Sequence, residues 1–423
     1  MQNEKGGSAM QILRILSILI AGLFFLCYSY QILYIPAALR KQKQENTPIK
    51  LHKYAVLICA RNESAVIAEL IESLKRQTYP ASLTEIFVLA DNCTDRTAEI
   101  AGSHGATVYE RYNQTQIGKG YALQELLEHI RRDRPMGFDG YFVFDADNVL
   151  SPDYIERMNE TFSEGFDAVT SYRNSKNYGD NWISAGYALW FLRESQYLNR
   201  ARMKLSTSCA VSGTGFLFSR KLMEQMGGWP FHLLTEDIEF TVQHVLRGVR
   251  IGYCERAELF DEQPTDFRQS WRQRTRWTKG YLQVFSRYGK DLMRQMIRGD
   301  FAAFDMAMNI MPAFFLSAAG LLVELTAMVL CLLSGGGLGA VFVSLLRIFG
   351  SMCGLLFVLG ALTTVTEWNR IRATKWEKIR AVFTFPIFMT TYLPIAICAV
   401  FAKAEWKPIE HKVSAKRLDL PAA

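Results

Sequence analysis

The uneven distribution of apolar residues along the chain constrains its fold more than any other feature. Residues 12–35 form an apolar run that is long enough to cross a hydrocarbon core of about 30 Å. The basic residues Arg40, Lys41 and Lys43 follow directly, and cytoplasmic flanks of membrane segments tend to carry such residues. A buried core helix is the weaker interpretation, because the run is apolar all round. We therefore predict an uncleaved transmembrane anchor over residues 11–35.

Further apolar stretches lie near the other end of the chain, at residues 302–333, 338–365 and 381–402. They predict about three transmembrane or re-entrant segments, followed by a basic tail over residues 403–423. If each stretch crosses once, the basic loop at 368–380 and the basic tail lie on opposite sides of the membrane. This conflicts with the tendency of basic segments to lie on the cytoplasmic side. Pro386 and Pro394 offer a second interpretation, in which the last stretch is broken into a re-entrant or interfacial piece. The side of the tail therefore stays open.

Charged residues are concentrated between the apolar stretches, in a segment long enough for one large domain. Because 49% of all residues are hydrophobic, a disordered or collagen-like protein is excluded. The eight cysteines are scattered without a CxxC pair, which argues against a zinc knuckle or a disulfide framework. We expect a cytoplasmic domain over residues 51–298, with the lipid bilayer rather than a nucleic acid as its macromolecular partner.

The first half of this domain alternates short β-branched or aromatic runs with helical patterns, which is typical of βαβ units and a mostly parallel sheet. The predicted strands cover residues 55–59, 86–90, 107–109, 141–144 and 168–170. Acidic residues follow the first four runs, at Glu63, Asp91, Glu110 and Asp145. Each alone is an ordinary turn residue, but the carboxyl ends of parallel strands form the ligand crevice of an open sheet. Their joint placement therefore predicts an acidic pocket.

Asp145 and Asp147 are two residues apart, so an extended backbone directs both side chains to the same side. Such a pair supplies the hard oxygen ligands that suit Mg²⁺ or Mn²⁺, and a metal held this way can bridge the phosphates of a nucleotide diphosphate. The alternative is a solvated turn that leads into Ser151-Pro152 as the cap and first residue of a helix.

Gly118-Lys119-Gly120 precedes a helical pattern and offers backbone N–H groups and an ammonium to a phosphate. A surface lysine after a flexible turn is the alternative interpretation. The segment is not a GxxxxGK[ST] loop, and no GxGxxG follows the first strand, so the NTPase and dinucleotide oxidoreductase classes lose their main support.

Thr235-Glu236-Asp237 opens another predicted helix, whose apolar face includes Phe240 and Val245. Thr235 is a suitable helix cap, and acidic residues favour the positive end of a helix dipole. In the functional interpretation, Asp237 is a general base held at the helix N-terminus in the same crevice. Both interpretations can hold together.

Gln273, Arg276, Trp277 and Gly280 have the i, i+3, i+4, i+7 spacing that places them on one face of a predicted helix. This face combines a hydrogen bonder, a cation and an aromatic ring. The alternative is a basic amphipathic helix on anionic lipid, with these side chains toward the headgroups: Arg268, Arg272, Arg274 and Lys279.

Taken in order, these segments resemble the membrane-bound members of glycosyltransferase family 2, the family of cellulose, chitin, hyaluronan and poly-N-acetylglucosamine synthases. The resemblance covers residues 54–280. It rests on the succession Arg61-Asn-Glu63, Asp91, Lys119, Asp145-Ala-Asp147, Ser212-Gly-Thr-Gly215, Gly227-Gly-Trp229, Thr235-Glu-Asp237 and Gln273-x-x-Arg276-Trp277. It implies a GT-A fold, which is an α/β Rossmann-like nucleotide-diphospho-sugar domain, here flanked by N- and C-terminal transmembrane helices.

The resemblance also implies roles for the residues that bind the donor. Glu63 and Asp91 would contact the nucleoside, and Lys119 would contact the sugar donor. Asp145 and Asp147 would hold the diphosphate and its divalent metal, which is Mg²⁺ or Mn²⁺.

On the acceptor side, the resemblance implies that Asp237 is the base that removes the proton from the acceptor hydroxyl. Arg276 would contact the donor diphosphate. Gln273, Glu236 and Trp277 would border the acceptor, with Trp277 as a platform on which a sugar stacks.

The implied activity is inverting, metal-dependent transfer of a hexosyl unit, glucose or N-acetylglucosamine, from a UDP-sugar to a growing β-linked polysaccharide. A multi-pass protein of a bacterial plasma membrane is the expected setting. The single apolar segment before the domain and the small number after it leave room for a narrow bundle only. Transfer of one sugar to a lipid acceptor is therefore the first alternative. A transporter or scaffold with a non-catalytic nucleotide-binding domain is a more distant one, because every carboxylate that the chemistry needs is present.

Overall fold

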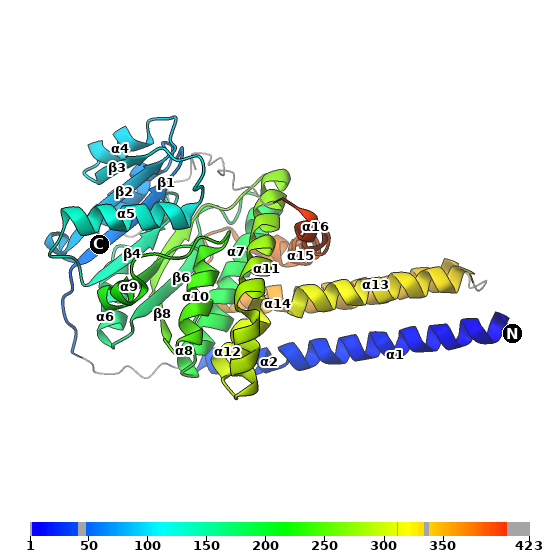
Figure 1. The fold of residues 1–423 in the computed structure, drawn as a ribbon. Coiled ribbons are helices and arrows are strands. Elements are labelled where there is room, and N and C mark those ends of the chain that lie inside the picture. Colours follow the sequence, from blue (N-terminus) through cyan, green and yellow to red (C-terminus); the bar gives the residue numbers. More distant parts are fainter. Residues whose placement is uncertain (1, 41–47, 311, 334–337, 404–423) are drawn as a thin grey trace.

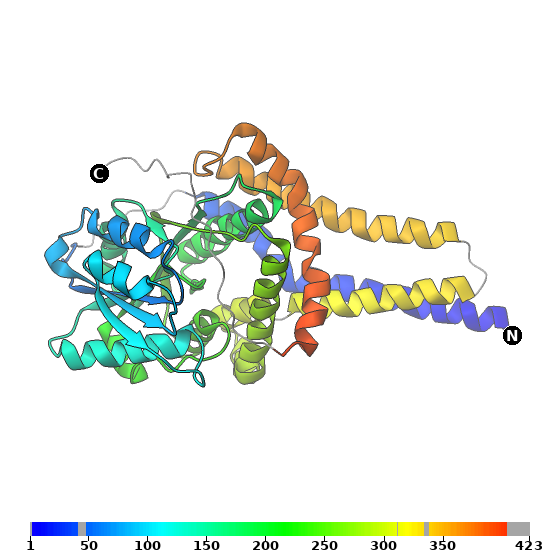
Figure 2. The same cartoon turned by 90° about the horizontal axis from the view of Figure 1, so that it is seen from above.

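The computed structural model describes residues 2–40, 48–310, 312–333 and 338–403. It consists of an α/β domain from which three long helices project side by side (Figures 1 and 2). These helices are α1 (Gln2–Tyr28), α13 (Pro312–Leu333) and α14 (Leu338–Thr366). The predicted basic tail lies, from residue 404 on, outside the described residues.

The α/β domain is built on one eight-stranded mixed sheet with the order β3-β2-β1-β4-β7-β6-β8-β5. The strands are β1 (Tyr54–Ala60), β2 (Thr84–Asp91), β3 (Thr107–Arg111), β4 (Gly140–Phe144), β5 (Val149–Leu150), β6 (Ala168–Ser175), β7 (Phe216–Ser219) and β8 (Ile251–Asp261). The first four strands in the spatial order are parallel, and β7 joins antiparallel to both β4 and β6. Each of the five strands predicted from the sequence lies within an observed strand.

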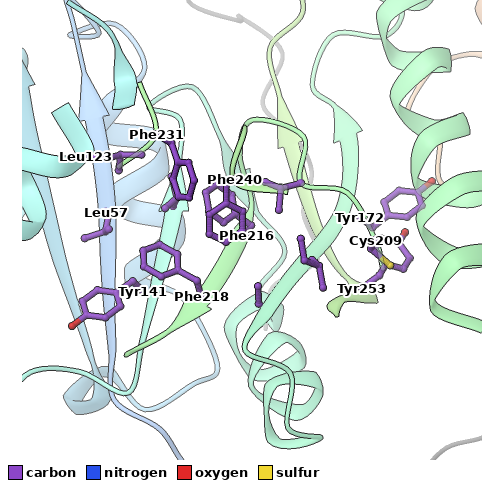
Figure 3. Close-up of a cluster of buried hydrophobic side chains, with 14 of the residues drawn as sticks. Leu57, Leu123, Tyr141, Tyr172, Cys209, Phe216, Phe218, Phe231, Phe240 and Tyr253 are labelled. Carbon is purple, nitrogen blue, oxygen red and sulfur yellow. The ribbon is translucent and has the colours of Figure 1, made fainter. Parts of the chain in front are cut away.

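Side chains alternate between the two faces of the sheet, so each face has its own apolar core. On one face, Leu57 packs with Leu123 of α5 (Lys119–Asp133) and with Phe231, as Figure 3 shows. On the other face, Ile58 packs with Leu70 of α3 (Ile67–Lys75). Further helices of this part are α4 (Thr97–Ser103), α6 (Tyr154–Ser163), α9 (Arg220–Met226) and α10 (Glu236–Leu246).

The helix predicted to begin at Ser151-Pro152 is α6, and it begins only at Tyr154, with Asp153 in the cap position. The Ser151 backbone N–H donates to the carbonyl of Glu258 in β8, 2.9 Å away. Ser151 therefore follows directly on the sheet, and its buried hydroxyl has no hydrogen-bond partner among the described residues, so it does not cap α6.

A nearly continuous helix connects the sheet with the N-terminal helices. It consists of α7 (Trp182–Arg193), a π-helical turn labelled η2 (Glu194–Asn199) and α8 (Arg200–Lys204). Tyr197 and Leu198 pack against Tyr34 and Ala38 of α2 (Tyr30–Leu39). The α/β domain is thereby packed against the helix that continues α1.

Four helical segments are long and apolar enough to cross a membrane: Gln11–Leu39, Phe315–Leu333, Phe349–Thr366 and Lys375–Phe401. The apolar stretch predicted at 302–333 is divided. Its first part is a separate helix, α12 (Phe301–Ile310), whose buried residues pack on α10 and on α11 (Phe267–Ile297). Asp300 accepts a hydrogen bond from the Ala303 N–H at 3.0 Å, and Pro312 opens α13, where a missing N–H costs nothing.

The last apolar segment does not run parallel to the others. It consists of α15 (Lys375–Thr390) and α16 (Tyr392–Phe401), which are joined at Thr391. Figures 1 and 2 together show α16 running crosswise to α13 and α14, beside the α/β domain. It packs along α11.

Candidate active site

A cavity of about 520 Å³ opens at the carboxyl ends of β1, β2 and β4. All ten residues predicted as site residues line it: Glu63, Asp91, Lys119, Asp145, Asp147, Glu236, Asp237, Gln273, Arg276 and Trp277. They come from segments that are far apart in sequence, so the crevice expected at the strand ends is present. Their individual roles stay predictions.

The loop after β1 and the loop after β2 are tied together at one end of this cavity. Asn62 adopts the left-handed conformation with φ of 58°, and its side-chain oxygen accepts a hydrogen bond from the Thr94 N–H at 2.8 Å. Asp91 is buried and accepts a hydrogen bond from the Arg111 guanidinium at 2.7 Å. Burial raises the pKa of Asp91, while Arg111 opposes the shift. The charge of Arg111 thus offsets part of the cost of burying the Asp91 carboxyl group at this end of the cavity.

Lys119 is the first residue of α5 and points into the cavity. Its ammonium donates to the Asp145 carboxylate and to the carbonyl of Gly213, the latter at 2.8 Å. Burial lowers the pKa of Lys119, but the carboxyl groups of Asp145 and Glu236 outweigh this effect and raise it above the ordinary value. Gly120 allows the close approach of this turn, because a Cβ there would lie 1.9 Å from the carbonyl oxygen of Phe231. The surface-lysine interpretation is therefore wrong.

The two aspartates after β4 both line the cavity, as the functional interpretation requires. The Asp145 N–H donates to Thr214 Oγ1 at 2.9 Å, and Asp147 accepts a hydrogen bond from the Glu262 N–H at 3.1 Å. Among the described residues no group of three or more His, Cys, Asp or Glu forms a cation site. Two carboxylates fit Mg²⁺ or Mn²⁺ nevertheless, because such ions are commonly held by one or two carboxylates together with substrate phosphates.

Beside the aspartates lies a charged group that sequence reasoning missed. Arg173 donates to Asp261 at 2.7 Å and to the Ser212 carbonyl at 2.8 Å, and its guanidinium lies 3.7 Å from the ring centroid of Phe191. Burial raises the pKa of Asp261 to about 6 against the lowering effect of Arg173, and Asp147 adds to the rise. Arg173 lies in β6 beyond the predicted strand at 168–170, and Asp261 ends β8, which was not predicted, so the strand-end rule could find neither residue.

The N-terminus of α10 places Glu236 and Asp237 at the opposite wall. Burial and Asp237 raise the pKa of Glu236 to about 7. Burial also raises the pKa of Asp237, whereas the Ile238 N–H, Lys119 and Arg276 lower it. A partly desolvated carboxylate with nearby cations is a suitable general base.

Thr235 occupies the cap position of α10, but its side chain makes no capping hydrogen bond, so this part of the sequence prediction is wrong. Its hydroxyl is buried and has no hydrogen-bond partner among the described residues. The reason is the close packing of α11, because a Cβ on Gly280 would lie 2.5 Å from Thr235 Cγ2. The side chain fills the contact between the two helices instead of capping one of them.

Helix α11 presents Gln273, Arg276 and Trp277 to the cavity. Arg276 donates to the Leu234 carbonyl at 3.0 Å, just before α10. The Trp277 ring meets Tyr187 edge-on, with ring centroids 5.7 Å apart.

The alternative of a headgroup-facing basic helix is wrong for Arg274. This residue is fully buried against the rings of Phe388 and Tyr392, and it donates to Thr391 Oγ1 at 2.7 Å. Lys279 donates to the Val400 carbonyl at 3.1 Å. Both cations therefore attach α11 to α15 and α16 rather than to lipid.

The cavity continues from these residues into the bundle of apolar helices. The residues that line this continuation, which we call the apolar branch, come from α1, α13, α14, α15 and α16: Phe24, Ser317, Ala318, Leu321, Met352, Leu355, Leu356, Met389, Tyr392, Leu393, Ala396 and Ile397. None of these carries a charge. One cavity thus has a charged part in the α/β domain and an apolar part among the candidate membrane helices.

A mixed α/β sheet with paired aspartates at its strand ends, joined to apolar helices long enough to cross a membrane, defines a protein of the GT-A fold class. The chain belongs to the family described as glycosyltransferase like family 2, which matches residues 52–280. The family resemblance and the fold class predicted from the sequence are thereby confirmed.

Relatives in this family include enzymes with two kinds of product. The chain is 26% identical over 250 residues to the β-monoglucosyldiacylglycerol synthase of Synechocystis, covering 57% of this chain and 50% of the relative. It is 27% identical over 238 residues to the poly-β-1,6-N-acetyl-D-glucosamine synthase of Staphylococcus epidermidis, covering 55% of each. The chain therefore matches only about half the length of these relatives.

The fold is also similar to that of the mannosyltransferase PcManGT from Pyrobaculum calidifontis, solved in complex with GDP-Man and Mn²⁺. The TM-score is 0.58 at 17% sequence identity, with 93% of this chain and 100% of that chain covered. At this level of identity the likeness concerns the fold alone.

Proposed function

We propose that the protein transfers one hexosyl unit, glucose or N-acetylglucosamine, from a UDP-sugar to a hydroxyl group of a membrane lipid, with inversion at the anomeric carbon. The observation that carries this proposal is the single cavity that joins the paired aspartates and Asp237 to the apolar branch. A lipid can place its headgroup at Asp237 and its hydrocarbon in the apolar branch.

The same cavity favours a lipid over the growing polysaccharide expected first from the sequence. A sugar chain carries hydroxyl groups along its whole length, and burying these without hydrogen-bond partners is costly. In the apolar branch only Ser317 and Tyr392 carry hydroxyl groups, and the other lining side chains are apolar. The relative that makes a glucosyl lipid supports this choice, and the relative that makes poly-N-acetylglucosamine keeps the polymer as an outcome to be tested.

In the proposed reaction the acceptor oxygen attacks the anomeric carbon from the side opposite the diphosphate. The new carbon–oxygen bond forms as the bond to the β-phosphate oxygen breaks, and the electron pair leaves with UDP. The proton of the acceptor hydroxyl passes to the Asp237 carboxylate, a contribution typically of about 10²–10⁴ in rate. Because one displacement occurs and no side chain acts as a nucleophile, the configuration inverts.

The remaining residues bind the donor and stabilise the leaving group. Asp145 and Asp147 would hold Mg²⁺ or Mn²⁺, which when bound neutralises charge on the diphosphate. Lys119 and Arg276 add positive charge at the same place, and Glu63 and Asp91 border the nucleoside. Gln273 and Trp277 hold the acceptor headgroup beside Glu236.

The arrangement of the helices supports a cytoplasmic active site at a bacterial plasma membrane. With α1, α13 and α14 as spans and α16 along the interface, the α/β domain and the basic loop at 368–380 lie on the same side. The start of α1 and the far end of α13 lie away from the domain (Figures 1 and 2). In this topology the basic loop at 368–380 follows the positive-inside rule.

The test uses the purified protein in nanodiscs with Mg²⁺ or Mn²⁺, a panel of UDP-sugars and a lipid acceptor, with Asp237→Asn as the control. UDP release that depends on the lipid, together with a single-sugar lipid product, is the expected result. A long saccharide made without added lipid would establish the polymer synthase instead. Nucleotide binding without turnover would establish the non-catalytic class.

A further inference from the structure

A carboxyl group that the proposed mechanism does not use lies at the point where the charged part of the cavity meets the apolar branch. This is Glu194, a cavity-lining residue at the start of the π-helical turn η2. Within the described part of the chain the one hydrogen bond of its side chain comes from the Ser212 hydroxyl, at a long 3.4 Å. A π-helical turn inside an α-helix is often found at functional sites.

The surroundings of Glu194 belong to both parts of the cavity. One helical turn earlier, Trp190 and Phe191 line the same wall, and Phe191 carries the Arg173 guanidinium on its ring. Both rings pack in one cluster with Trp277 and with Met389 and Tyr392 of the apolar branch. Glu194 therefore lies between the position of the proposed base and the position of the lipid hydrocarbon.

Two of the three cations near Glu194 are paired with other carboxylates, and the third donates to an amide. Arg173 is bound to Asp261. Arg193 donates to Gln31 of α2 at 2.7 Å, and Arg202 is bound to Asp305. An acceptor headgroup at this junction would meet the carboxyl groups of Glu194, Glu236 and Asp237. The cations that line the same cavity already have partners there: Lys119 is bound to Asp145, Arg173 to Asp261, and Arg276 donates to the Leu234 carbonyl.

We propose that Glu194 is a specificity-determining residue that binds the acceptor headgroup, and that this acceptor is a neutral lipid with hydroxyl groups rather than a lipid phosphate. A carboxyl group accepts a hydrogen bond from a headgroup hydroxyl, whereas a phosphate would be repelled by the acidic wall. The use of Asp237 agrees with this class, because a hydroxyl needs a base and an ionised phosphate does not. The inference rests on the proposed function.

The experiment compares two acceptors with the same acyl chains in nanodiscs, dioleoylglycerol and dioleoylphosphatidic acid, with the UDP-sugar that gives turnover. For the wild type we expect kcat/KM at least 100-fold higher with dioleoylglycerol. In Glu194→Gln the KM for dioleoylglycerol should rise about tenfold and the preference over phosphatidic acid should fall about tenfold, while the KM for the UDP-sugar stays constant. Glu194→Asp should keep the preference and raise only the KM for the lipid.

Glu99→Gln, on the exposed surface of α4, is the matched control and should leave all of these constants unchanged. UDP binding by each variant shows that the fold is intact, and Glu194→Asp serves if Glu194→Gln does not fold. Equal use of the two lipids, or unchanged constants in Glu194→Gln, would overturn the role of Glu194 but leave the proposed function standing. Absence of any lipid product would overturn both.

Discussion

Arg202 and Asp305 form a fully buried ion pair, with distances of 2.6 and 3.1 Å from Nε and NH2 to the two carboxylate oxygens. The pair joins α8 of the α/β domain to α12, the helix that precedes α13. Tyr30 and Tyr34 of α2 donate to the same carboxylate at 2.7 and 3.0 Å. One carboxyl group thus connects three elements that are distant in the sequence.

We predict that Asp305→Asn destabilises the protein by about 3–5 kcal/mol, because it leaves the Arg202 charge buried without its counter-charge. Thermal unfolding in detergent or nanodiscs measures the loss. The double variant Arg202→Met/Asp305→Leu should recover much of it, since it removes both charges together. Arg96→Met, which breaks an exposed pair with Glu99, is the control and should leave the melting temperature unchanged. A double variant less stable than Asp305→Asn would contradict the explanation.

Gly280 should tolerate no side chain. We predict that Gly280→Ala costs about 1–3 kcal/mol and lowers turnover, because the added Cβ meets Thr235 and pushes α11 away from the Asp237 turn. Thr235→Gly in the same chain should restore part of both losses, which separates this collision from a general loss of helix flexibility. The measurements are thermal unfolding and kcat. Full activity of Gly280→Ala would show that the packing of α10 and α11 is looser than described.

Stability should depend on pH through Glu236. An ordinary glutamate releases its proton near pH 4.5, whereas Glu236 in the folded protein holds it to about pH 7. The folded state therefore binds more protons than the unfolded state between these values, and the free energy of unfolding falls as the pH rises through this window. Glu236→Gln should flatten the decline, as measured by melting temperature at pH 5 and pH 7.5. Glu99→Gln should keep the wild-type slope, and a slope unchanged in Glu236→Gln would refute the assignment.

Removal of divalent metal should abolish turnover. We expect EDTA to stop UDP release and added Mn²⁺ or Mg²⁺ to restore it, because the two aspartates need a cation to bind a diphosphate. Asp147→Asn should raise the metal concentration that gives half-maximal activity, while Asp291→Asn, on the exposed side of α11, should not. Wild-type activity that persists in EDTA would remove the metal from the proposed function.

The parts of the site that could be predicted from the sequence are those marked by local signals. Asp91 and Asp145 follow apolar strands, and Lys119 and Asp237 stand where helices begin, so a strand-end rule and a helix-start pattern suffice to find them. Glu194 follows neither a predicted strand nor a helix start. It lies in the middle of a helix, and only the tertiary packing of α7 and η2 against the cavity shows that it lines the site.

The directions of the apolar helices could not be predicted from the sequence either. Hydropathy measures how apolar a stretch is but contains no information about its direction. The hydropathy pattern therefore predicted one stretch at 302–333 for both α12 and α13. In the structure, the Asp305 carboxylate binds α12 to the α/β domain. Hydropathy also could not give the crosswise direction of α16, which depends on contacts such as that of Arg274 with Thr391.

The crosswise position of α16 has a consequence for kinetics. If this helix forms the boundary between the bilayer and the charged part of the cavity, an acceptor lipid reaches Asp237 by lateral diffusion and its hydrocarbon never enters water. The reaction then takes place in two dimensions on the acceptor side and in three on the donor side. Turnover would follow the mole fraction of acceptor in the leaflet, so that diluting it with inert lipid slows the reaction even when its total amount in the tube is unchanged.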